Sequence, residues 1–242
     1  MEDLKGKIAI ITGGNSGIGY ATAQRLKENG AEVIITGRRK EALEKAAKDL
    51  KVTAIVADQS KLSDIENLTH QVKKQFGEID ILLINAGITK FAMIEETTEN
   101  LFDEIMNVNF KGAYFTLSRF IPLLNNDASV IMLSSTSATI SPQSASIYAA
   151  SKAAINAVVK IAALELAPRR IRINAVSPGP IATEIMDKIG LTEDLENHLI
   201  QSIPLKRMGK AKEVADMIYY LTSKNAGFIT GANFLVDGGQ SI

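Results

Sequence analysis

Two side chains that could exchange a proton, Tyr148 and Lys152, stand four residues apart in a run of small and apolar residues. If that run is helical, this spacing puts the phenol and the ammonium on one face and within reach of each other. A neighbouring cation favours the phenolate, so it lowers a phenol pKa that is normally about 10. Tyr148 is therefore a candidate general acid and base. A lone Tyr-x-x-x-Lys pattern also arises often by chance, and the alternative is ordinary helix packing.

A serine-rich loop, with Ser134, Ser135 and Ser137, precedes this pair and follows an apolar run over 129–133. A serine at the end of a strand can hydrogen-bond the oxygen of a substrate carbonyl. Spacing alone does not choose among the three serines, and a loop without a chemical role is the alternative.

Other kinds of catalysis are excluded by residues and motifs that the sequence lacks. A serine nucleophile would need a Gly-x-Ser-x-Gly elbow and a histidine partner; the elbow is absent, and the two histidines, His70 and His198, lie in polar helical surroundings. The chain has no cysteine, which excludes disulfides, thiolate metal sites and cysteine nucleophiles. We predict no metal site.

A glycine-rich turn follows the first apolar run, with the sequence Thr12-Gly13-Gly14-Asn15-Ser16-Gly17-Ile18-Gly19. Its glycines permit backbone angles and close approaches that a β-carbon would block. The N–H groups and the dipole of the helix that follows then face an anion, commonly a pyrophosphate. The spacing is Gly-x-x-x-Gly-x-Gly and not the standard Gly-x-Gly-x-x-Gly, so a turn without a ligand is the alternative.

The second apolar run ends in Gly37-Arg38-Arg39. An NAD site usually places an acidic residue here, where it binds the adenosine ribose hydroxyls. Glycine stands there instead, and Arg38 is suited to a 2′-phosphate. For Arg39, the solvated start of a charged helix is an equal alternative. The residues therefore favour NADP(H) and leave NAD(H) as the alternative, because no basic residue stands at Ser16 in the glycine turn.

Two further strand ends carry polar residues, Asp58-Gln59 and Asn85-Ala86-Gly87. Strand ends of a doubly wound sheet face the crevice that binds ligands. Asp58 could accept a hydrogen bond from an adenine amino group, or it could cap the helix that begins near Lys61.

The chain as a whole alternates short apolar runs with longer segments of helical period. Continuous runs of Val, Ile and Leu are typical of strands that are covered on both faces. We therefore predict an α/β fold, a single-domain Rossmann-type doubly wound sheet of seven parallel strands with helices on both faces, over residues 1–242. The predicted strands are 7–12, 32–36, 52–57, 80–84, 129–133, 171–176 and 233–236, and the predicted helices are 17–29, 39–50, 61–76, 98–124, 146–167 and 211–222. The stretch 180–207 is predicted to be an insertion.

Composition limits the partners. The 242 residues include 27 basic and 27 acidic ones, so the global field needed for nonspecific nucleic-acid binding is absent. No apolar run approaches the ~18 residues of a membrane span, and the acidic start does not resemble a signal peptide. We expect a cytoplasmic protein that binds neither nucleic acid nor membrane.

Taken in order, these motifs resemble those of the short-chain dehydrogenase/reductase family, in its compact one-domain branch that includes 3-oxoacyl reductases and related carbonyl reductases. The resemblance covers essentially the whole chain and rests on Thr12-Gly13-(x)3-Gly17-Ile18-Gly19, Asn85-Ala86-Gly87, Asn109, Ser135, Tyr148-(x)3-Lys152, Pro178-Gly179 and Val236-Asp237-Gly238-Gly239. One departure is Ile84, where many relatives have a second asparagine.

The resemblance implies a role for each matching residue. It makes Tyr148 the catalytic acid and base, Lys152 the residue that holds the nicotinamide ribose and lowers the pKa of the tyrosine, and Ser135 the residue that orients the substrate carbonyl. Asn109 would anchor a proton-relay water. The implied adenosine-side positions are Asp58, Asn85, Ala86 and Gly87, with Gln59 beside them, and the implied nicotinamide-side positions are Pro178, Gly179, Ile181 and Thr183.

The implied reaction is hydride transfer between a nicotinamide cofactor and a small-molecule ketone or aldehyde, or the corresponding secondary alcohol, with reduction as the favoured direction. A polyol, a sugar or a steroid-like ketone is equally admissible as the substrate. A substrate lid over 180–207 and a homotetramer are also implied. The apolar residues of the lid region suit either an apolar pocket or an amphipathic helix packed on its own domain. Asn125-Asn126-Asp127 argues mildly against a carrier-protein substrate, although Arg169, Arg170 and Arg172 follow nearby. The alternatives are a cofactor-binding sensor or scaffold without turnover, and a sugar-nucleotide epimerase or dehydratase.

Overall fold

The structure, a computed structural model, describes residues 4–140, 142–184 and 192–242. A sheet of seven strands lies at its centre in the order β3-β2-β1-β4-β5-β6-β9, and neighbouring strands run parallel throughout. This confirms the predicted doubly wound Rossmann-type sheet. The strands are β1 Ile8–Thr12, β2 Glu32–Gly37, β3 Thr53–Val56, β4 Ile79–Ile84, β5 Leu124–Leu133, β6 Arg172–Pro178 and β9 Asn233–Val236.

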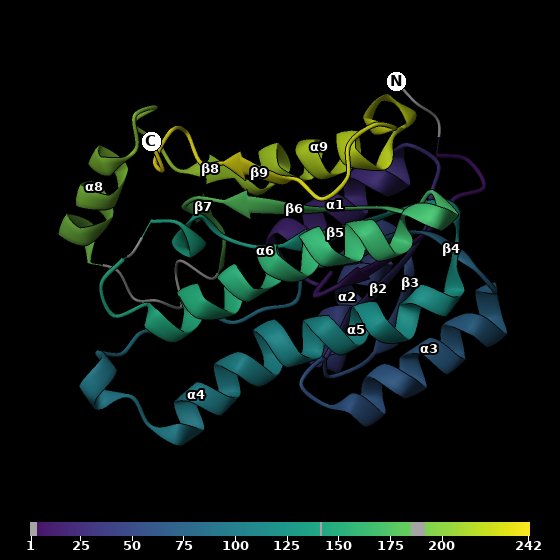
Figure 1. Cartoon of the computed structure of the whole chain (residues 1–242), viewed down its shortest axis with the longest axis horizontal. Helices are drawn as coiled ribbons and strands as arrows, with labels where there is room; N and C mark the ends of the chain where they lie inside the picture. Colours follow the sequence, from purple (N-terminus) through teal and green to yellow (C-terminus); the bar gives the residue numbers. More distant parts are fainter. Residues whose placement is uncertain (1–3, 141, 185–191) are drawn as a thin grey trace.

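Helices cover both faces of this sheet (Figure 1). One hydrophobic cluster packs α1, α2 and α9 against one face, and a second packs α3, α5 and α6 against the other. The helices are α1 Gly17–Glu28, α2 Lys40–Leu50, α3 Leu62–Phe76, α4 Glu99–Met106, α5 Ala113–Phe120, α6 Ser146–Leu166, α8 Glu193–Ser202 and α9 Ala211–Thr222.

Strand β1, an interior strand of the sheet, shows why the strand sequences are continuously apolar. Ala9 and Ile11 belong to the cluster under α1 and α9, whereas Ile10 belongs to the cluster under α3 and α6. All three are fully buried. Because successive side chains of a strand point to opposite faces, both sets must be apolar when both faces are covered.

The helix predicted over 98–124 is present as a run of consecutive helical residues, 99–123, with one π-helical turn inside it. Helix α4 ends at Met106, a π-helical turn spans Asn107–Gly112, and α5 begins at Ala113. At Gly112 a β-carbon would lie 2.1 Å from the carbonyl oxygen of Gln59, so only glycine permits this contact with the end of β3. Single π-helical turns of this kind are frequent at functional sites.

Strand β5 begins earlier than the predicted 129, at Leu124. The polar residues that follow hid this start, because Asn125 and Asp127 break the apolar pattern. Asp127 also has a left-handed backbone angle, with φ of 64°.

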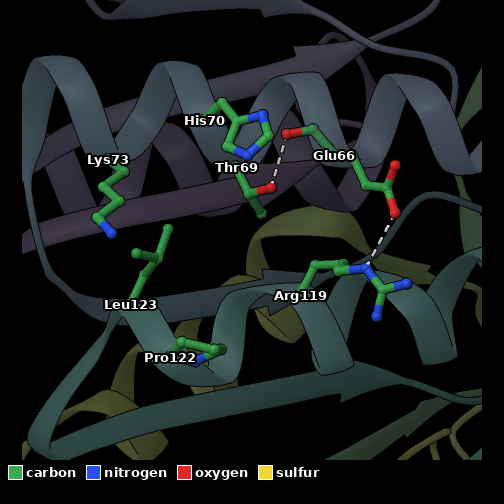
Figure 2. Close-up of a pocket in the computed structure, with 7 residues that line it drawn as sticks. All are labelled: Glu66, Thr69, His70, Lys73, Arg119, Pro122 and Leu123. Atoms are coloured by element: carbon green, nitrogen blue, oxygen red, sulfur yellow. Dashed lines mark hydrogen bonds and ion pairs between the residues drawn. The ribbon is translucent and has the colours of Figure 1, made fainter.

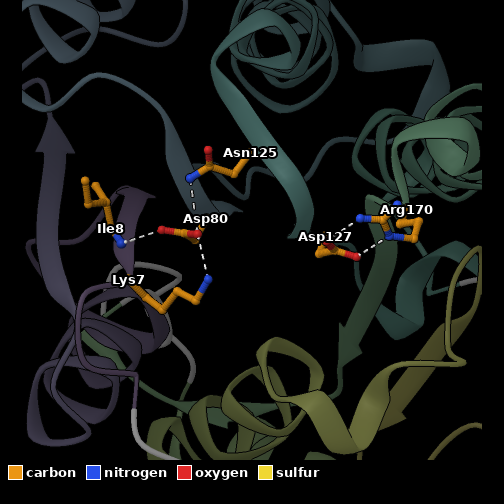
Figure 3. A network of polar contacts seen from close by, with 6 residues as sticks. All are labelled: Lys7, Ile8, Asp80, Asn125, Asp127 and Arg170. Carbon is orange, nitrogen blue, oxygen red and sulfur yellow. Dashed lines mark hydrogen bonds and ion pairs between the residues drawn. The ribbon is translucent and has the colours of Figure 1, made fainter.

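A polar network holds the amino ends of the central strands (Figure 3). Asp80 in β4 accepts hydrogen bonds from Lys7 Nζ at 2.8 Å, from the backbone N–H of Ile8 at 3.0 Å and from Asn125 Nδ2 at 3.2 Å. Nearby, Arg170 forms a two-pronged ion pair with Asp127, at 2.7 and 2.9 Å. These charges therefore lie at the opposite end of the strands from the glycine-rich turn.

The two ends of the segment 181–210, which follows β6, lie next to each other. A short strand β7, Ile181–Ala182, pairs in parallel with β8, Gly209–Lys210, and α8 lies between them in the chain. Of the apolar residues predicted for the lid, Ile203 is buried and Leu195 is exposed. Ile185, Met186, Ile189 and Leu191 lie outside the described residues.

Within the described ranges, one stretch, Ser146–Arg169, is long and apolar enough to cross a membrane by length and composition alone. The expectation that no such stretch exists was therefore too strict. In the fold this stretch is α6 with the turn after it, and its residues Ile155, Val159 and Leu166 are buried in the core. The core helix of a globular domain passes the same test.

Candidate active site

The glycine-rich turn between β1 and α1 forms a cradle at the carboxyl end of the sheet. Gly13 and Gly17 have positive φ, 67° and 55°, which favours glycine. A β-carbon on Gly19 would lie 2.3 Å from the carbonyl oxygen of Gly13, so the turn folds tightly onto the helix. Ser16 is the N-cap of α1 but makes no capping hydrogen bond. The first N–H groups of α1 thus lack a side-chain partner, which fits an anion such as a pyrophosphate.

Thr12 joins this turn to the end of β4. Its hydroxyl accepts hydrogen bonds from the backbone N–H groups of Asn85 and Ala86, both at 3.0 Å. Asn85 Nδ2 donates in return to the carbonyls of Thr12 and Gly13, at 2.9 and 3.1 Å. The predicted residues Gly13, Asn85 and Ala86 therefore meet, and the Asn85 side chain is occupied in fixing the turn.

Asp58 and Gln59 follow β3, and their side chains make different hydrogen bonds. Asp58 Oδ1 accepts hydrogen bonds from the backbone N–H and the hydroxyl of Ser60, at 3.0 and 2.8 Å, so that oxygen stabilises the turn before α3. Gln59 is buried, and its amide donates to the carbonyls of Ala86 and Val108, both at 3.0 Å. Gln59 thus ties the end of β4 to the π-helical turn.

Arg38 and Arg39 are exposed at the end of β2. Neither guanidinium pairs with any side chain that the structure describes. Beside them, Gly37 and Asn15 are in close contact, since a β-carbon on Gly37 would lie 2.9 Å from Asn15 Oδ1. The two arginines are therefore available to a ligand that reaches the glycine turn.

Of the three candidate serines, Ser135 is the one whose hydroxyl acts on the pKa of Tyr148, which it lowers. The hydroxyl of Ser134 is turned away and donates to the carbonyl of Lys152 at 3.1 Å. Ser137 contributes its backbone N–H, which donates to the Ser135 hydroxyl at 3.1 Å. The geometry thus separates residues that spacing alone could not.

Lys152 lies under the tyrosine in the buried part of α6. Its Nζ is 5.8 Å from the centre of the Tyr148 ring and donates to the carbonyl of Leu133 at 2.9 Å. Burial lowers the pKa of Lys152 to about 8. The ammonium and the phenol are neighbours, as the spacing predicted, but the hydrogen bond of the lysine goes to β5.

The predicted lowering of the Tyr148 pKa is wrong for this structure. Burial raises the pKa of Tyr148, and hydrogen bonds from Ser135 and Thr89 only partly oppose that effect. Withdrawing a phenolate from water costs more than two neutral hydroxyls return. The ammonium of Lys152, 5.8 Å from the centre of the ring, does not reverse this direction.

Asn109 lies in the π-helical turn and is buried. Its Oδ1 accepts from the backbone N–H of Ile88 at 2.8 Å, and its Nδ2 donates to the carbonyl of the same residue at 2.9 Å. A weaker contact, 3.4 Å, runs from Nδ2 to the hydroxyl of Ser151, which itself donates to the carbonyl of Tyr148 at 2.7 Å. Asn109 is therefore connected to both β4 and α6.

The segment after β6 closes the other side of the glycine turn. Gly179 packs on Asp237, where a β-carbon would lie 2.8 Å from the aspartate Cβ, and its N–H donates to the carbonyl of Val236. Thr183 lies next to Gly17, at about van der Waals distance from a β-carbon placed there. Pro178, Gly179, Ile181 and Thr183 thus run from the end of β6 to the glycine turn.

A recess elsewhere on the molecule, about 340 Å³ in volume, is formed by α3 and the end of α5 (Figure 2). An ion pair between Arg119 and Glu66, at 3.3 Å, lies across it. None of the predicted site residues lines this recess. The candidate active site is therefore assigned from the residues at the strand ends, and not from this recess.

Comparison with known proteins identifies similar chains over essentially the full length of this one. Residues 13–241 match a family model described as enoyl-(acyl carrier protein) reductase. A 3-oxoacyl-[acyl-carrier-protein] reductase of Thermotoga maritima is 36% identical over 99% of this chain and 99% of its own. An NADP-dependent (R)-specific alcohol dehydrogenase of Lentilactobacillus kefiri is 35% identical over 99% and 98%.

Solved structures give the same result. A short-chain dehydrogenase/reductase from Serratia marcescens BCRC 10948 superposes with a TM-score of 0.94 at 33% identity, covering 100% of both chains. The chain belongs to the short-chain dehydrogenase/reductase family. Two other similar structures are a 3-ketoacyl-(acyl-carrier-protein) reductase from Brucella melitensis in complex with NADH, and a blue fluorescent protein from a metagenomic library in complex with NADPH. They have TM-scores of 0.91 and 0.94, identities of 33% and 28%, and full or nearly full coverage.

Membership of the short-chain dehydrogenase/reductase family makes this chain an oxidoreductase that binds a nicotinamide cofactor. Sequence reasoning missed one residue near the site, Thr89, whose side chain lowers the pKa of Tyr148 against the effect of burial. The available signal was its position, two residues after Asn85-Ala86-Gly87, at a strand end that faces the crevice. A hydroxyl residue there could have been included on that ground.

Proposed function

We propose that this chain is an NADP(H)-dependent carbonyl reductase or alcohol dehydrogenase that acts on small ketones, aldehydes or secondary alcohols. The observation that carries the proposal is the buried Lys152, whose Nζ lies 5.8 Å from the centre of the Tyr148 ring, together with the Ser135 hydroxyl, which lowers the pKa of that tyrosine. These groups stand at the same end of the sheet as the glycine cradle, so a cofactor in the cradle would reach them.

The cofactor would be held by the residues around the cradle. The uncapped start of α1 suits the pyrophosphate, and Asp58 Oδ2 suits the adenine amino group because Oδ1 is engaged by Ser60. The exposed, unpaired Arg38 suits a 2′-phosphate, with Arg39 beside it. A relative whose name states NADP dependence supports this preference, while the neighbouring structures with NADPH and with NADH keep NAD(H) as the alternative.

A bound nicotinamide supplies or accepts a hydride at its C4 atom. The chain itself binds and orients the substrate and moves the proton. The Ser135 hydroxyl orients and polarises the carbonyl oxygen, and Tyr148 donates a proton to that oxygen in reduction or removes it in oxidation. Lys152 places a positive charge beneath the tyrosine ring, which favours loss of the phenol proton. Asn109 fixes the backbone beside this group through Ile88.

Small substrates are favoured over protein-bound ones by the arrangement of the nearby arginines. Arg170 is paired with Asp127, and Arg169 donates to the carbonyls of Ile121 and Leu124. Both arginines therefore form their hydrogen bonds at the amino ends of the strands, away from the proposed site. Neither of these two arginines is therefore available to bind an acidic carrier protein beside the site.

The test is a screen of small ketones, aldehydes and secondary alcohols, followed by the absorbance of NADPH with NADH in parallel. On an active substrate, Tyr148→Phe is expected to lower turnover roughly 10²–10⁴-fold, the usual contribution of a general acid or base. Cofactor binding, followed by fluorescence, should stay within a few-fold of the wild type. Tyr114→Phe, which removes the hydroxyl of a half-exposed tyrosine on α5, is the control. Turnover close to that of the wild type in Tyr148→Phe would contradict the proposal.

A further inference from the structure

Gln59 is a buried amide that binds two segments far from it in the chain. Its Nε2 donates to the carbonyl of Ala86, which follows β4, and to the carbonyl of Val108, which lies in the π-helical turn, both at 3.0 Å. Both protons of the amide nitrogen are therefore used. No described residue donates to the amide oxygen. The polar contacts of this side chain thus depend on its two donors.

Each of these two carbonyls belongs to the residue directly before one that lies beside Lys152. Ala86 precedes Gly87, the last residue of the Asn-Ala-Gly motif, and Val108 precedes Asn109. A β-carbon placed on Gly87 would lie 3.3 Å from Asn109 Oδ1 and 3.6 Å from Lys152 Nζ. The asparagine oxygen and the lysine ammonium therefore approach the same point above Gly87.

The carboxyl end of the π-helical turn also packs on Gln59. A β-carbon on Gly112 would collide with the carbonyl oxygen of Gln59 and would lie 2.9 Å from its Cγ. Only glycine permits so close an approach. The turn is therefore held by a hydrogen bond at Val108 and by packing at Gly112, and Asn109 lies between these two points.

From Asn109 the contacts continue to the helix that carries the tyrosine. Asn109 Nδ2 lies 3.4 Å from the hydroxyl of Ser151, whose own proton goes to the carbonyl of Tyr148 at 2.7 Å. A shift of the π-helical turn would therefore move Asn109 relative to both Lys152 and the start of α6. Displacements of about 1 Å near reacting groups can lower a rate roughly 100-fold.

We propose that Gln59 is a positioning residue, whose two hydrogen bonds hold Asn109 in place beside Lys152. This inference rests on the proposed function. It gives Gln59 a task that differs from the adenosine-side contact expected from the sequence, because its effect is on turnover and is exerted through Asn109.

The experiment replaces Gln59 by Met, which has a similar length but no donor, and by Glu. A buried carboxyl favours its protonated form, which donates one hydrogen bond where the amide donates two. In the full-length protein, Gln59→Met is expected to lower kcat roughly 10–100-fold, and Gln59→Glu should give an intermediate value. The KM for the cofactor should stay within about two-fold of the wild type. Gln71→Met, at an exposed position of α3, is the matched control and should change neither constant.

A double-mutant cycle tests whether Gln59 acts through Asn109. Asn109→Ala removes the side chain that the π-helical turn presents. In that background Gln59→Met should lower kcat further by less than about two-fold, because residues that act as a unit do not contribute additively. Single-turnover measurements with excess protein keep the slow variants measurable. If Gln59 supported only the general stability of the fold, the two losses would multiply.

The outcomes separate the two proposals. Unchanged turnover in Tyr148→Phe would overturn the proposed function. If Tyr148→Phe loses turnover while Gln59→Met keeps the wild-type kcat, the inference about Gln59 is overturned and the proposed function stands. A raised KM for the cofactor with unchanged kcat also overturns it, since that is the pattern of an adenosine contact, and so does a full loss of kcat in the Asn109→Ala background. If thermal unfolding shows that Gln59→Met does not fold, Gln59→Glu decides by the same criteria.

Discussion

The side-chain oxygen of Asn15 lies against Gly37, close enough that a β-carbon on Gly37 would come within 2.9 Å of it. Asn15 thus occupies the space at the end of β2 into which a larger residue at 37 would extend. An acidic side chain there, of the kind that NAD sites use, would first have to displace Asn15. The contact therefore links the glycine turn to the choice between the two cofactors.

The first prediction concerns Arg38. Arg38→Ala should weaken NADPH binding roughly 10–150-fold, since a hydrogen bond to a charged group contributes ~1.5–3 kcal/mol. NADH lacks the 2′-phosphate and should bind almost unchanged. The measurement is kcat/KM with each cofactor, for the wild type and the variant.

The matched control is Lys40→Ala, which removes an exposed cation two residues away that contacts Glu44. It should leave the ratio of the two kcat/KM values unchanged. A wild type that favours NADH, or a ratio that Arg38→Ala does not alter, would show that the arginine has no such role.

A second prediction combines Gly37→Asp with Arg38→Ala. This pair should reverse the preference to NADH, because it adds repulsion of the 2′-phosphate as well as removing attraction. Since the new side chain must displace Asn15, adding Asn15→Ser should increase the efficiency with NADH beyond that of the pair alone. Retained preference for NADPH in the double variant would refute the assignment.

A third prediction concerns the buried Lys152. Burial lowers the pKa of this side chain from 10.5 to about 8. Between about pH 8 and 10.5 the unfolded chain holds a proton that the folded chain does not, so stability rises with pH across this window. Below about pH 8 the cost of burying the charge is constant, about 3 kcal/mol. Lys152→Met should therefore increase the free energy of unfolding at pH 7 by about 2 kcal/mol, after about 1 kcal/mol for the lost hydrogen bond to Leu133.

Urea unfolding at several pH values measures this effect. Lys160→Met, on the exposed side of the same helix, serves as the control and should change stability little. Equal or lower stability of Lys152→Met at pH 7 would mean that the buried amine carries no such cost. Activity should nevertheless fall in this variant, because the charge beneath Tyr148 is gone.

The fourth prediction is a homo-oligomer, and by the family resemblance a homotetramer. On α6, Ile161 and Leu164 are 59% and 79% exposed, and Phe102 and Tyr114 on the neighbouring helices are nearly half exposed. Figure 1 shows these helices together on one face. An apolar surface of this extent favours association. Sedimentation should give a species larger than 26.1 kDa, and Leu164→Glu should shift it toward that mass.

A wild type that sediments as a single monomer at micromolar concentration would reject this association. The control is Lys160→Glu, which reverses a charge on the same helix without removing apolar surface. It should leave the sedimentation pattern unchanged.

Much of the fold could be predicted because each strand is buried on both faces, which leaves an uninterrupted apolar run such as Ile8–Thr12. The order of glycine turn, serine, tyrosine and lysine was likewise visible, since these residues follow strand ends or share a helical face. The early start of β5 was hidden by its polar residues. The π-helical turn was not predicted either; within it, Gly112 contacts Gln59, which is far from it in the sequence.

The electrostatics of the site could not be predicted from spacing. A four-residue separation places Lys152 near Tyr148, but it does not reveal that the lysine proton is directed at the Leu133 carbonyl. Nor does it give the degree of burial, which outweighs the hydroxyls of Ser135 and Thr89. Such quantities depend on the surroundings of a group in three dimensions.

Because Ile181 pairs with Gly209, the stretch between them starts and ends at neighbouring points of the fold. Its two ends leave the domain side by side, where the N–H of Gly209 donates to the carbonyl of Pro180 at 2.9 Å and Arg207 is paired with Glu213 at 2.6 Å. Doubling the length of a loop whose ends are fixed costs only about 0.6 kcal/mol. Changes of length and sequence before Ile203 should therefore leave β6 and α9 in place, whereas Ile203, which is buried, belongs to the part of the stretch that must be kept.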